Sequence, residues 1–212
     1  MRAARKISLS VVKRLPRYYR YLGELLADKI TRISSKELSE RMAVTASQIR
    51  QDLNNFGCFG QQGYGYNVEQ LYCAIKDLLG LSRGYETIIV GAGNIGQSIV
   101  KYKTFEKRGF FFKAMFDIDE ELIGQSVVGV PVYSVDDLEK YLSAWKIDIA
   151  VLSLPKTEAE NIFQTIVGCG VKGIWNFSHM DLVGPPSVKI ENVHLTDSLM
   201  TLSYRLNEAE DT

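Results

Sequence analysis

The sequence has no long apolar run and few cysteines, and each shortage excludes a class of protein. No uninterrupted apolar stretch approaches the ~18 residues that a membrane-spanning helix needs. The basic N-terminus also lacks the apolar segment and small-residue cleavage site of a signal peptide. The three cysteines are an odd number without a Cys-x-x-Cys spacing, which indicates reduced thiols rather than a disulfide framework. We therefore expect a cytoplasmic protein with no membrane partner.

Charge is balanced overall but divided unevenly along the chain. Residues 1–60 carry 12 Lys and Arg against 5 Asp and Glu. Because the whole chain has 25 of each, the remainder carries 13 basic and 20 acidic residues. A basic end joined to an acidic body is typical of a protein whose basic end faces nucleic acid. A solvated basic surface without a partner is the alternative.

Residues 87–96 form the stretch around which the chain is organised, Thr-Ile-Ile-Val-Gly-Ala-Gly-Asn-Ile-Gly. A β-branched run predicts a buried strand, three glycines follow in the Gly-x-Gly-x-x-Gly spacing, and a helix is predicted over residues 97–108. The first glycine permits a tight turn, the second admits a pyrophosphate, and the third lets the helix pack closely on the strand. The residues expected to contact a dinucleotide here are Gly91, Ala92, Gly93, Asn94, Ile95 and Gly96.

A second apolar strand is predicted over residues 110–116 and ends in Asp117. This acid lies 21 residues after Gly96, close to the ~20 expected for the carboxylate that binds the adenosine ribose. A carboxylate accepts hydrogen bonds from both ribose hydroxyls and repels a 2′-phosphate, which favours NAD(H) over NADP(H). A related domain that binds another nucleotide, such as coenzyme A, is the alternative.

Strands and helices alternate through the rest of this region, as in a doubly wound α/β domain with a parallel sheet. Strands are predicted over residues 129–133, 147–154 and 171–177, and helices over residues 135–143 and 158–168. Ligands of such sheets bind outside the carboxyl ends of the strands. The positions predicted to share that rim with the glycine loop are Asp117, Ser153, Pro155, Asn176 and Phe177.

The N-terminal region has the pattern of a winged helix-turn-helix. A helix is predicted over residues 11–27, with Pro16 near its start. Capping patterns at residues 34–37 and 45–48 predict two short helices, the second of which would enter the major groove of DNA. Glycines and aromatics over residues 56–66 predict a hairpin wing. The expected DNA contacts, each with a solvated surface as its alternative, are Arg14, Arg17, Ser47, Gln48, Arg50, Gln51, Gly63 and Tyr64.

The last predicted helix, residues 196–212, has a narrow apolar stripe formed by Leu199, Leu202 and Leu206. Such a stripe suits packing against another helix. It is equally compatible with a helix that docks on its own domain.

Four segments together resemble a known family. Arg-Leu-Pro-x-Tyr-Tyr-Arg over residues 14–20 and Ser-Gln-Ile-Arg-x-Asp-Leu over residues 47–53 precede the glycine-rich wing and the Gly-Ala-Gly-Asn-Ile-Gly loop. In this order they resemble the Rex family of redox-sensing bacterial transcriptional repressors. The resemblance implies a homodimer that exchanges its C-terminal helices and binds operator double-stranded DNA. It also implies that NADH releases the protein from this DNA and that NAD⁺ opposes the release. We expect a winged-helix domain over 1–82, a Rossmann domain over 83–195 and a dimerisation helix over 196–212.

The resemblance also implies a polar switch, and there this chain departs from the family. An Arg, a Tyr and an Asp tend to form that switch. Arg20 and Tyr102 match the first two, but His194 stands at the third position and replaces an anion with a neutral or cationic ring. Other departures are glutamines where the family commonly has Lys or Arg, namely Gln51, Gln61 and Gln62.

No catalytic set and no metal-ligand spacing stand out among the two histidines and the acidic residues. His179 follows a predicted strand, where the base of a small NAD-dependent oxidoreductase would lie. The Rossmann region, however, leaves no room for a separate substrate domain. We therefore expect a protein that is not an enzyme. The alternatives are that oxidoreductase and a nucleotide-binding dimer with weakened DNA binding.

Overall fold

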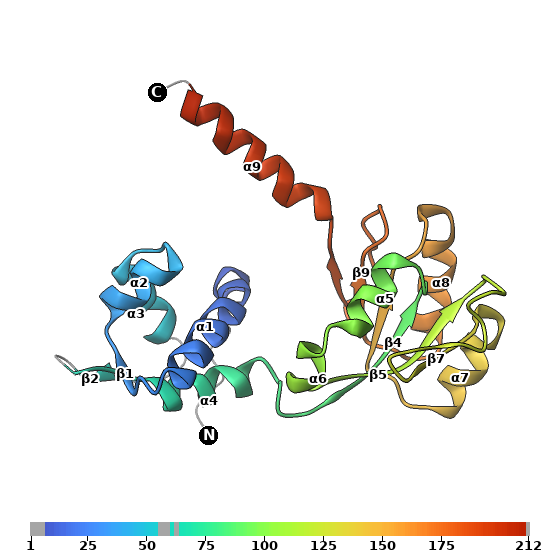
Figure 1. Cartoon of the computed structure of the whole chain (residues 1–212), viewed down its shortest axis with the longest axis horizontal. Helices are drawn as coiled ribbons and strands as arrows, with labels where there is room; N and C mark the ends of the chain where they lie inside the picture. The colour runs from blue at the N-terminus through green and yellow to red at the C-terminus, as the bar shows by residue number, and fades with distance from the viewer. Residues whose placement is uncertain (1–6, 55–59, 62–63, 211–212) are drawn as a thin grey trace. The chain divides into compact units, whose positions relative to one another are not determined.

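The computed structural model describes residues 7–54, 60–61 and 64–210, and the chain divides into two compact units (Figure 1). The first unit extends to Arg83 and the second begins at Gly84. Each is described by itself below. No helix in the described ranges is long and apolar enough to cross a membrane.

The first unit consists of four helices and a small antiparallel sheet. Its helices are α1 (Leu9–Ala27), α2 (Ser35–Met42), α3 (Ala46–Asn54) and α4 (Val68–Leu78). Its strands are β1 (Arg32–Ile33), β2 (Gly60–Gln61) and β3 (Gly65–Asn67), in the order β1-β3-β2. The antiparallel pairing of β2 with β3 confirms the predicted hairpin. The strand β1 was not predicted, and Gln62 and Gly63 lie outside the described residues.

Helices α1, α2, α3 and α4 share one apolar core. Leu22, Leu38 and Ile49 are completely buried in it, each from a different helix. The predicted capping box is present, because the Ser34 hydroxyl accepts from the Glu37 amide and the Glu37 carboxylate accepts from the Ser34 amide. The helix predicted over residues 11–27 is confirmed as α1. The helix starts at Leu9, and the proline lies inside it.

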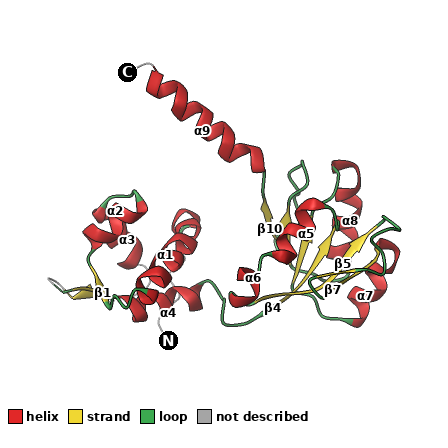
Figure 2. Cartoon of the chain, viewed as in Figure 1, coloured by secondary structure: helices red, strands yellow, loops and turns green. Residues whose placement is uncertain are grey.

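The second unit contains a seven-stranded sheet in the order β10-β9-β8-β4-β5-β7-β6 (Figure 2). All pairs are parallel except β6 with β7. The first strand, β4, has β5 on one side and β8 on the other, so the strand order reverses there, where such sheets bind their ligands. The strands are β4 (Tyr85–Val90), β5 (Phe110–Asp117), β6 (Ser126–Val127), β7 (Val130–Ser134), β8 (Ile149–Leu152), β9 (Gly173–Asn176) and β10 (Lys189–Asn192).

Helices cover both faces of this sheet. On one face α7 (Leu138–Ala144) and α8 (Lys156–Gly168) pack against apolar residues of β4, β5 and β8. On the other face lie α5 (Asn94–Lys101) and α6 (Thr104–Lys107). These two replace the single helix predicted over residues 97–108. The chain leaves the helical conformation at Tyr102, whose ψ is 87°.

The apolar side chains of the C-terminal helix α9 (Leu195–Glu210) are not covered by the described residues of the chain. Leu199, Leu202 and Leu206 are 65%, 51% and 59% exposed. Every side chain described in this helix is exposed. Among the described residues, α9 is therefore not docked on its own domain, which was one of the two alternatives from the sequence.

Candidate nucleotide and DNA sites

The glycine loop connects β4 to α5, and each of its three glycines occupies a different environment. Gly91 has a φ of +101°, and a Cβ there would overlap the carbonyl oxygen of Ser153. A Cβ on Gly96 would overlap the carbonyl oxygen of Gly91. A Cβ on Gly93, by contrast, would meet nothing within 4 Å. The first and third glycines are thus required by the fold, and the second leaves open space at the N-terminus of α5, where a pyrophosphate would bind.

Neighbouring strand ends hold the loop in place. The Gly91 amide donates to Phe116 O at 2.8 Å, and Ser153 Oγ donates to Gly91 O at 2.7 Å. Asp117 Oδ2 accepts from the Ala92 amide at 2.5 Å. The other oxygen of Asp117 accepts from the two amides that follow it in the chain. Asp117, predicted to bind the adenosine ribose, therefore also anchors the glycine loop. Its spacing from the glycines in the sequence did not predict this second role.

The side chain of Asn176, a residue predicted on the cofactor rim, is engaged within the protein. It is completely buried, and its Nδ2 donates to Met180 O and to Asn192 Oδ1, both at 2.8 Å. Its Oδ1 accepts from the amide and the hydroxyl of Ser178. The side chain thus organises the turn after β9 and joins it to β10. No donor or acceptor of the Asn176 side chain remains for a ligand, and a cofactor contact at this residue stays a prediction.

The remaining rim positions are partly accessible. Phe177 is half-buried and lies edge-on to Trp175, with ring centroids 4.6 Å apart. Pro155 is exposed and precedes α8. A cavity of about 220 Å³ lies beside the loop, lined by Ala92, Gln97 and residues of β6 and β7. The rim therefore offers an open loop, a carboxylate and an adjacent hollow.

A larger apolar cavity of about 370 Å³ lies elsewhere on the sheet. It is lined by Phe105 of α6 and by residues from β4, β5, β8, β9 and β10, among them Trp175 and Ile190. Thr87, Ile149 and Gly173, which also line it, come early in their strands. This cavity is consequently separate from the carboxyl rim where the glycine loop lies.

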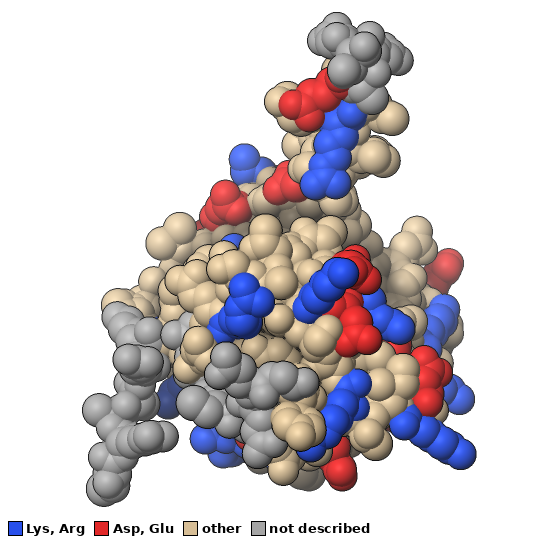
Figure 3. Space-filling model, turned by 90° about the vertical axis from the view of Figure 1, so that its left-hand side faces the viewer, with Lys and Arg blue, Asp and Glu red and all other residues tan. Residues whose placement is uncertain are grey.

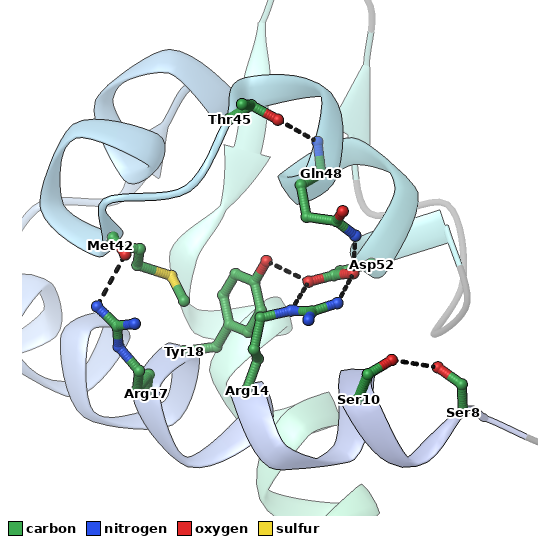
Figure 4. Close-up of polar contacts among 9 residues, drawn as sticks. All are labelled: Ser8, Ser10, Arg14, Arg17, Tyr18, Met42, Thr45, Gln48 and Asp52. Carbon is green, nitrogen blue, oxygen red and sulfur yellow. Dashed lines mark hydrogen bonds and ion pairs between the residues drawn. The ribbon is translucent and has the colours of Figure 1, made fainter. Parts of the chain in front are cut away.

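In the first unit, a buried carboxylate joins α1 to α3 (Figure 4). Asp52 is 0% exposed. Arg14 donates to both of its oxygens at 2.7 Å, Tyr18 donates to Oδ2 at 2.9 Å, and Gln48 donates to Oδ1 at 2.8 Å. Arg14, predicted as a DNA contact, thus also pairs through its Nε and Nη2 with Asp52, and its contact with DNA stays a prediction. Asp52 itself was not singled out from the sequence, since a lone Asp in a short helix gives no sign of burial.

The ionisation of this cluster follows from its hydrogen bonds. Burial alone would raise the pKa of Asp52, but donation from Arg14, Gln48 and Tyr18 outweighs burial and lowers it. The hydrogen bonds to Asp52 also raise the pKa of Arg14. Burial, followed by the hydrogen bond to Asp52, raises the pKa of Tyr18. The carboxylate therefore remains ionised and the phenol protonated near neutral pH.

The other residues expected to contact DNA lie on or near α3, and the two arginines among them also form hydrogen bonds within the chain. Ser47 and Gln51 are exposed on α3. Arg50 donates to Ser35 Oγ at 3.1 Å, and Arg17 donates to Met42 O, the last carbonyl of α2, at 2.8 Å. Both arginines are exposed, so these contacts brace the helix pair while leaving each side chain at the surface.

Tyr64, beside the wing, is 70% exposed. It lies against Arg32, which was not predicted from the sequence as a DNA contact. The Arg32 guanidinium is 5.9 Å from its ring centroid and donates to its carbonyl oxygen at 3.3 Å. Figure 3 shows Lys and Arg side chains spread over one face of the molecule rather than gathered into one patch. Cationic groups of this kind are suited to phosphate contacts.

The three expected switch residues do not all lie in one unit. Arg20 is exposed on α1 of the first unit. Tyr102, 61% exposed, follows α5 in the second unit, and His194 immediately precedes α9. His194 Nε2 lies 2.9 Å from Asp181 Oδ1, and this hydrogen bond raises the pKa of the imidazole. Their assembly into a switch stays a prediction. No cluster of three or more potential metal ligands occurs among the described residues.

Comparison with known proteins matches both halves of the chain. A family model for a putative DNA-binding protein N-terminus matches residues 6–54, and a model for a CoA binding domain matches residues 82–180. The redox-sensing transcriptional repressor Rex of Thermoanaerobacter pseudethanolicus is 56% identical over 205 residues, which cover 97% of this chain and 92% of that protein.

Solved structures of a Rex-family repressor, RSP, are similarly close. The complex of RSP with NAD⁺ and operator DNA has 56% identity and a TM-score of 0.90, covering 96% of this chain and 94% of that one. The complex with NADH has 53% identity and a TM-score of 0.89, covering 97% and 96%. With the glycine loop at the sheet's switch point and the helix-turn-helix in one chain, these matches confirm the resemblance seen in the sequence. The chain belongs to the Rex family of redox-sensing transcriptional repressors.

Proposed function

We propose that this protein is a repressor that binds operator DNA through α3 and the wing and is released from it by NADH. The observation that carries this proposal is the open space at Gly93, beside a carboxylate rim, in a chain whose other unit is a helix-turn-helix. The complexes of RSP, one with NAD⁺ and operator DNA and one with NADH, support both ligands. The protein acts as a repressor and not as an enzyme, like the repressors that this chain matches.

The nucleotide is NAD(H) rather than coenzyme A or NADP(H). Asp117 presents a carboxylate at the end of β5, where the adenosine ribose of a dinucleotide lies and where a 2′-phosphate would be repelled. The oxidised nicotinamide ring carries a positive charge that the reduced ring lacks. Phe177 and Trp175 make the end of β9 apolar, so the oxidised ring loses more favourable solvation there. NADH is therefore the tighter ligand.

The functional protein is a homodimer formed through α9. The exposed leucines of that helix and the open apolar cavity against β9 and β10 are surfaces that a second copy would bury. Two recognition helices would then meet successive major grooves, about 34–36 Å apart along the duplex. NADH shifts the dimer away from that spacing only by binding the released state more tightly. Action on operator DNA places the protein in the cytoplasm.

Titration of the operator complex tests the proposal directly. Fluorescence anisotropy of a labelled operator, first selected by this protein from a randomised duplex pool, should fall with NADH and change little with NAD⁺ or coenzyme A. A Gly93→Ala variant, whose methyl group fills the loop's open space, should bind the same operator and resist NADH. Equal release by NADH and NAD⁺, or release by coenzyme A alone, would refute the proposed effector.

A further inference from the structure

The side-chain amide of Gln48 has a fixed orientation in the free protein. Gln48 is half-buried on α3, and its Nε2 donates to Asp52 Oδ1 one turn further along the helix, at 2.8 Å. A carboxylate only accepts hydrogen bonds, so the amide nitrogen has to face Asp52. The carbonyl oxygen Oε1 consequently turns away from the buried cluster, as Figure 4 shows.

The cluster resists the alternative orientation. Asp52 Oδ2 accepts from Arg14 Nε and the Tyr18 hydroxyl, and Oδ1 accepts from Arg14 Nη2 and Gln48. Turning the amide by 180° would set Oε1 against a carboxylate oxygen, losing one hydrogen bond and placing two acceptors in contact. The order of acceptor and donor that α3 presents at this position is thus set before any DNA arrives.

We propose that Gln48 reads an adenine in each operator half-site, with Asp52 as the positioning residue that sets the orientation of its amide. This inference rests on the proposed function. Oε1 accepts from the adenine 6-amino group, and the second hydrogen of Nε2 donates to N7. In the major groove only adenine offers a donor beside an acceptor on one base. Guanine offers two acceptors, cytosine a donor and thymine an acceptor with a methyl group.

Base analogues test this reading one atom at a time. In an operator selected from a randomised duplex pool, each adenine of a half-site is replaced by purine, which lacks the 6-amino group, or by 7-deazaadenine, which lacks N7. The unmodified protein should lose about tenfold in affinity with either analogue at one adenine position per half-site. Gln48→Met, which keeps the side-chain length but no hydrogen-bonding group, should bind the natural and modified operators equally.

A matched control exists in the second unit. Gln164 on α8 donates from Nε2 to Glu160 Oε1 at 2.8 Å, also four residues away, but on an exposed surface. Gln164→Met removes the same kind of contact and should retain the sensitivity of the unmodified protein to both analogues. In the free protein, NMR hydrogen exchange should show the Gln48 side-chain amide protected relative to that of Gln164.

The possible results distinguish a failure of the roles given to Gln48 and Asp52 from a failure of the proposed function. If Gln48→Met keeps the sensitivity to the analogues, Gln48 is not the reading residue. If the Gln48 amide exchanges as fast as that of Gln164, Asp52 does not fix its orientation. If the unmodified protein selects no sequence at all from the pool, the proposed function fails first.

Discussion

The two units position their functional groups by opposite means. In the first unit, α1 and α3 are joined by a buried ion pair, and the recognition helix is oriented by hydrogen bonds that converge on Asp52. In the second, the ligand loop is shaped by backbone conformation, with Gly91 at a φ of +101° and no room for a side chain. The first arrangement depends on a buried ion pair, and the second depends on a loop position that admits no side chain.

This difference predicts which changes each unit tolerates. The first unit should withstand modest changes of volume near the cluster but fail when one charge loses its partner. The second should fail when a single methyl group is added where the backbone of the loop leaves no room. The predictions below test that contrast, from the largest expected effect to the smallest.

Gly91→Ala should have the largest effect. Its Cβ would overlap the Ser153 carbonyl oxygen, which belongs to the backbone after β8 and cannot rotate away. A positive φ adds strain for any side chain, so we expect a loss of about 3–5 kcal/mol in unfolding free energy for the second unit. Binding of NADH, measured by calorimetry, should be abolished.

Gly93→Ala is the control for that change. A methyl group at this position meets no protein atom within 4 Å, so the thermal unfolding of the second unit should stay unchanged. Only the affinity for NADH should fall, because the methyl group occupies the space for the pyrophosphate. Equal destabilisation by the two variants would contradict the distinct roles given to the two glycines.

Arg14→Ala should have the next largest effect, and on the other unit. It leaves the fully buried carboxylate of Asp52 without its bidentate partner. Removing one member of a buried pair costs about 3–5 kcal/mol; because the Arg14 side chain is 24% exposed, we expect about 2–3 kcal/mol here. Calorimetry should show a lower transition for the first unit only. An unchanged transition would show that the pair does not stabilise α1 against α3.

The sequence could predict the local features of both units. The glycine loop was located correctly because its requirement is local: a φ that only glycine adopts freely, at a fixed spacing after a β-branched strand. The strand over residues 110–116 and the capping box at Ser34 were likewise local patterns, and the structure confirms both.

The contacts that the sequence did not predict join distant residues. Arg14 was interpreted as a DNA contact because nothing near it in the sequence indicates Asp52, which lies 38 residues away. Asn176 was placed on the cofactor rim, but Asn192 of β10, a strand without a clear pattern, takes up its amide. In the sequence, polar residues of both regions resemble surface residues, because their hydrogen-bond partners lie far away along the chain.

Acid should weaken the first unit through the protonation of Asp52. The folded state lowers the pKa of Asp52 below its unfolded value of about 3.9. The stabilisation is therefore present above about pH 4 and lost as the pH falls through the folded pKa. Thermal melts between pH 2.5 and 7 should show the transition of the first unit falling at the acid end. In Arg14→Ala this loss should be smaller, and an identical pH profile would count against the assignment.

The smallest effect is expected in the second unit, at the pair of His194 with Asp181 beside α9. The hydrogen bond to Asp181 raises the folded pKa of His194 above its unfolded value of about 6.5. A raised pKa means that the stabilisation is present below pH 6.5 and lost as the pH rises through the folded pKa. His194→Asn should therefore lower the melting temperature of the second unit slightly at pH 5.5 and leave it unchanged at pH 8. Because both side chains are partly exposed, solvent screens the pair, and Asp181→Asn should reproduce the same small pH-dependent difference. A difference that persists at pH 8 would mean that His194 acts through packing rather than through its charge.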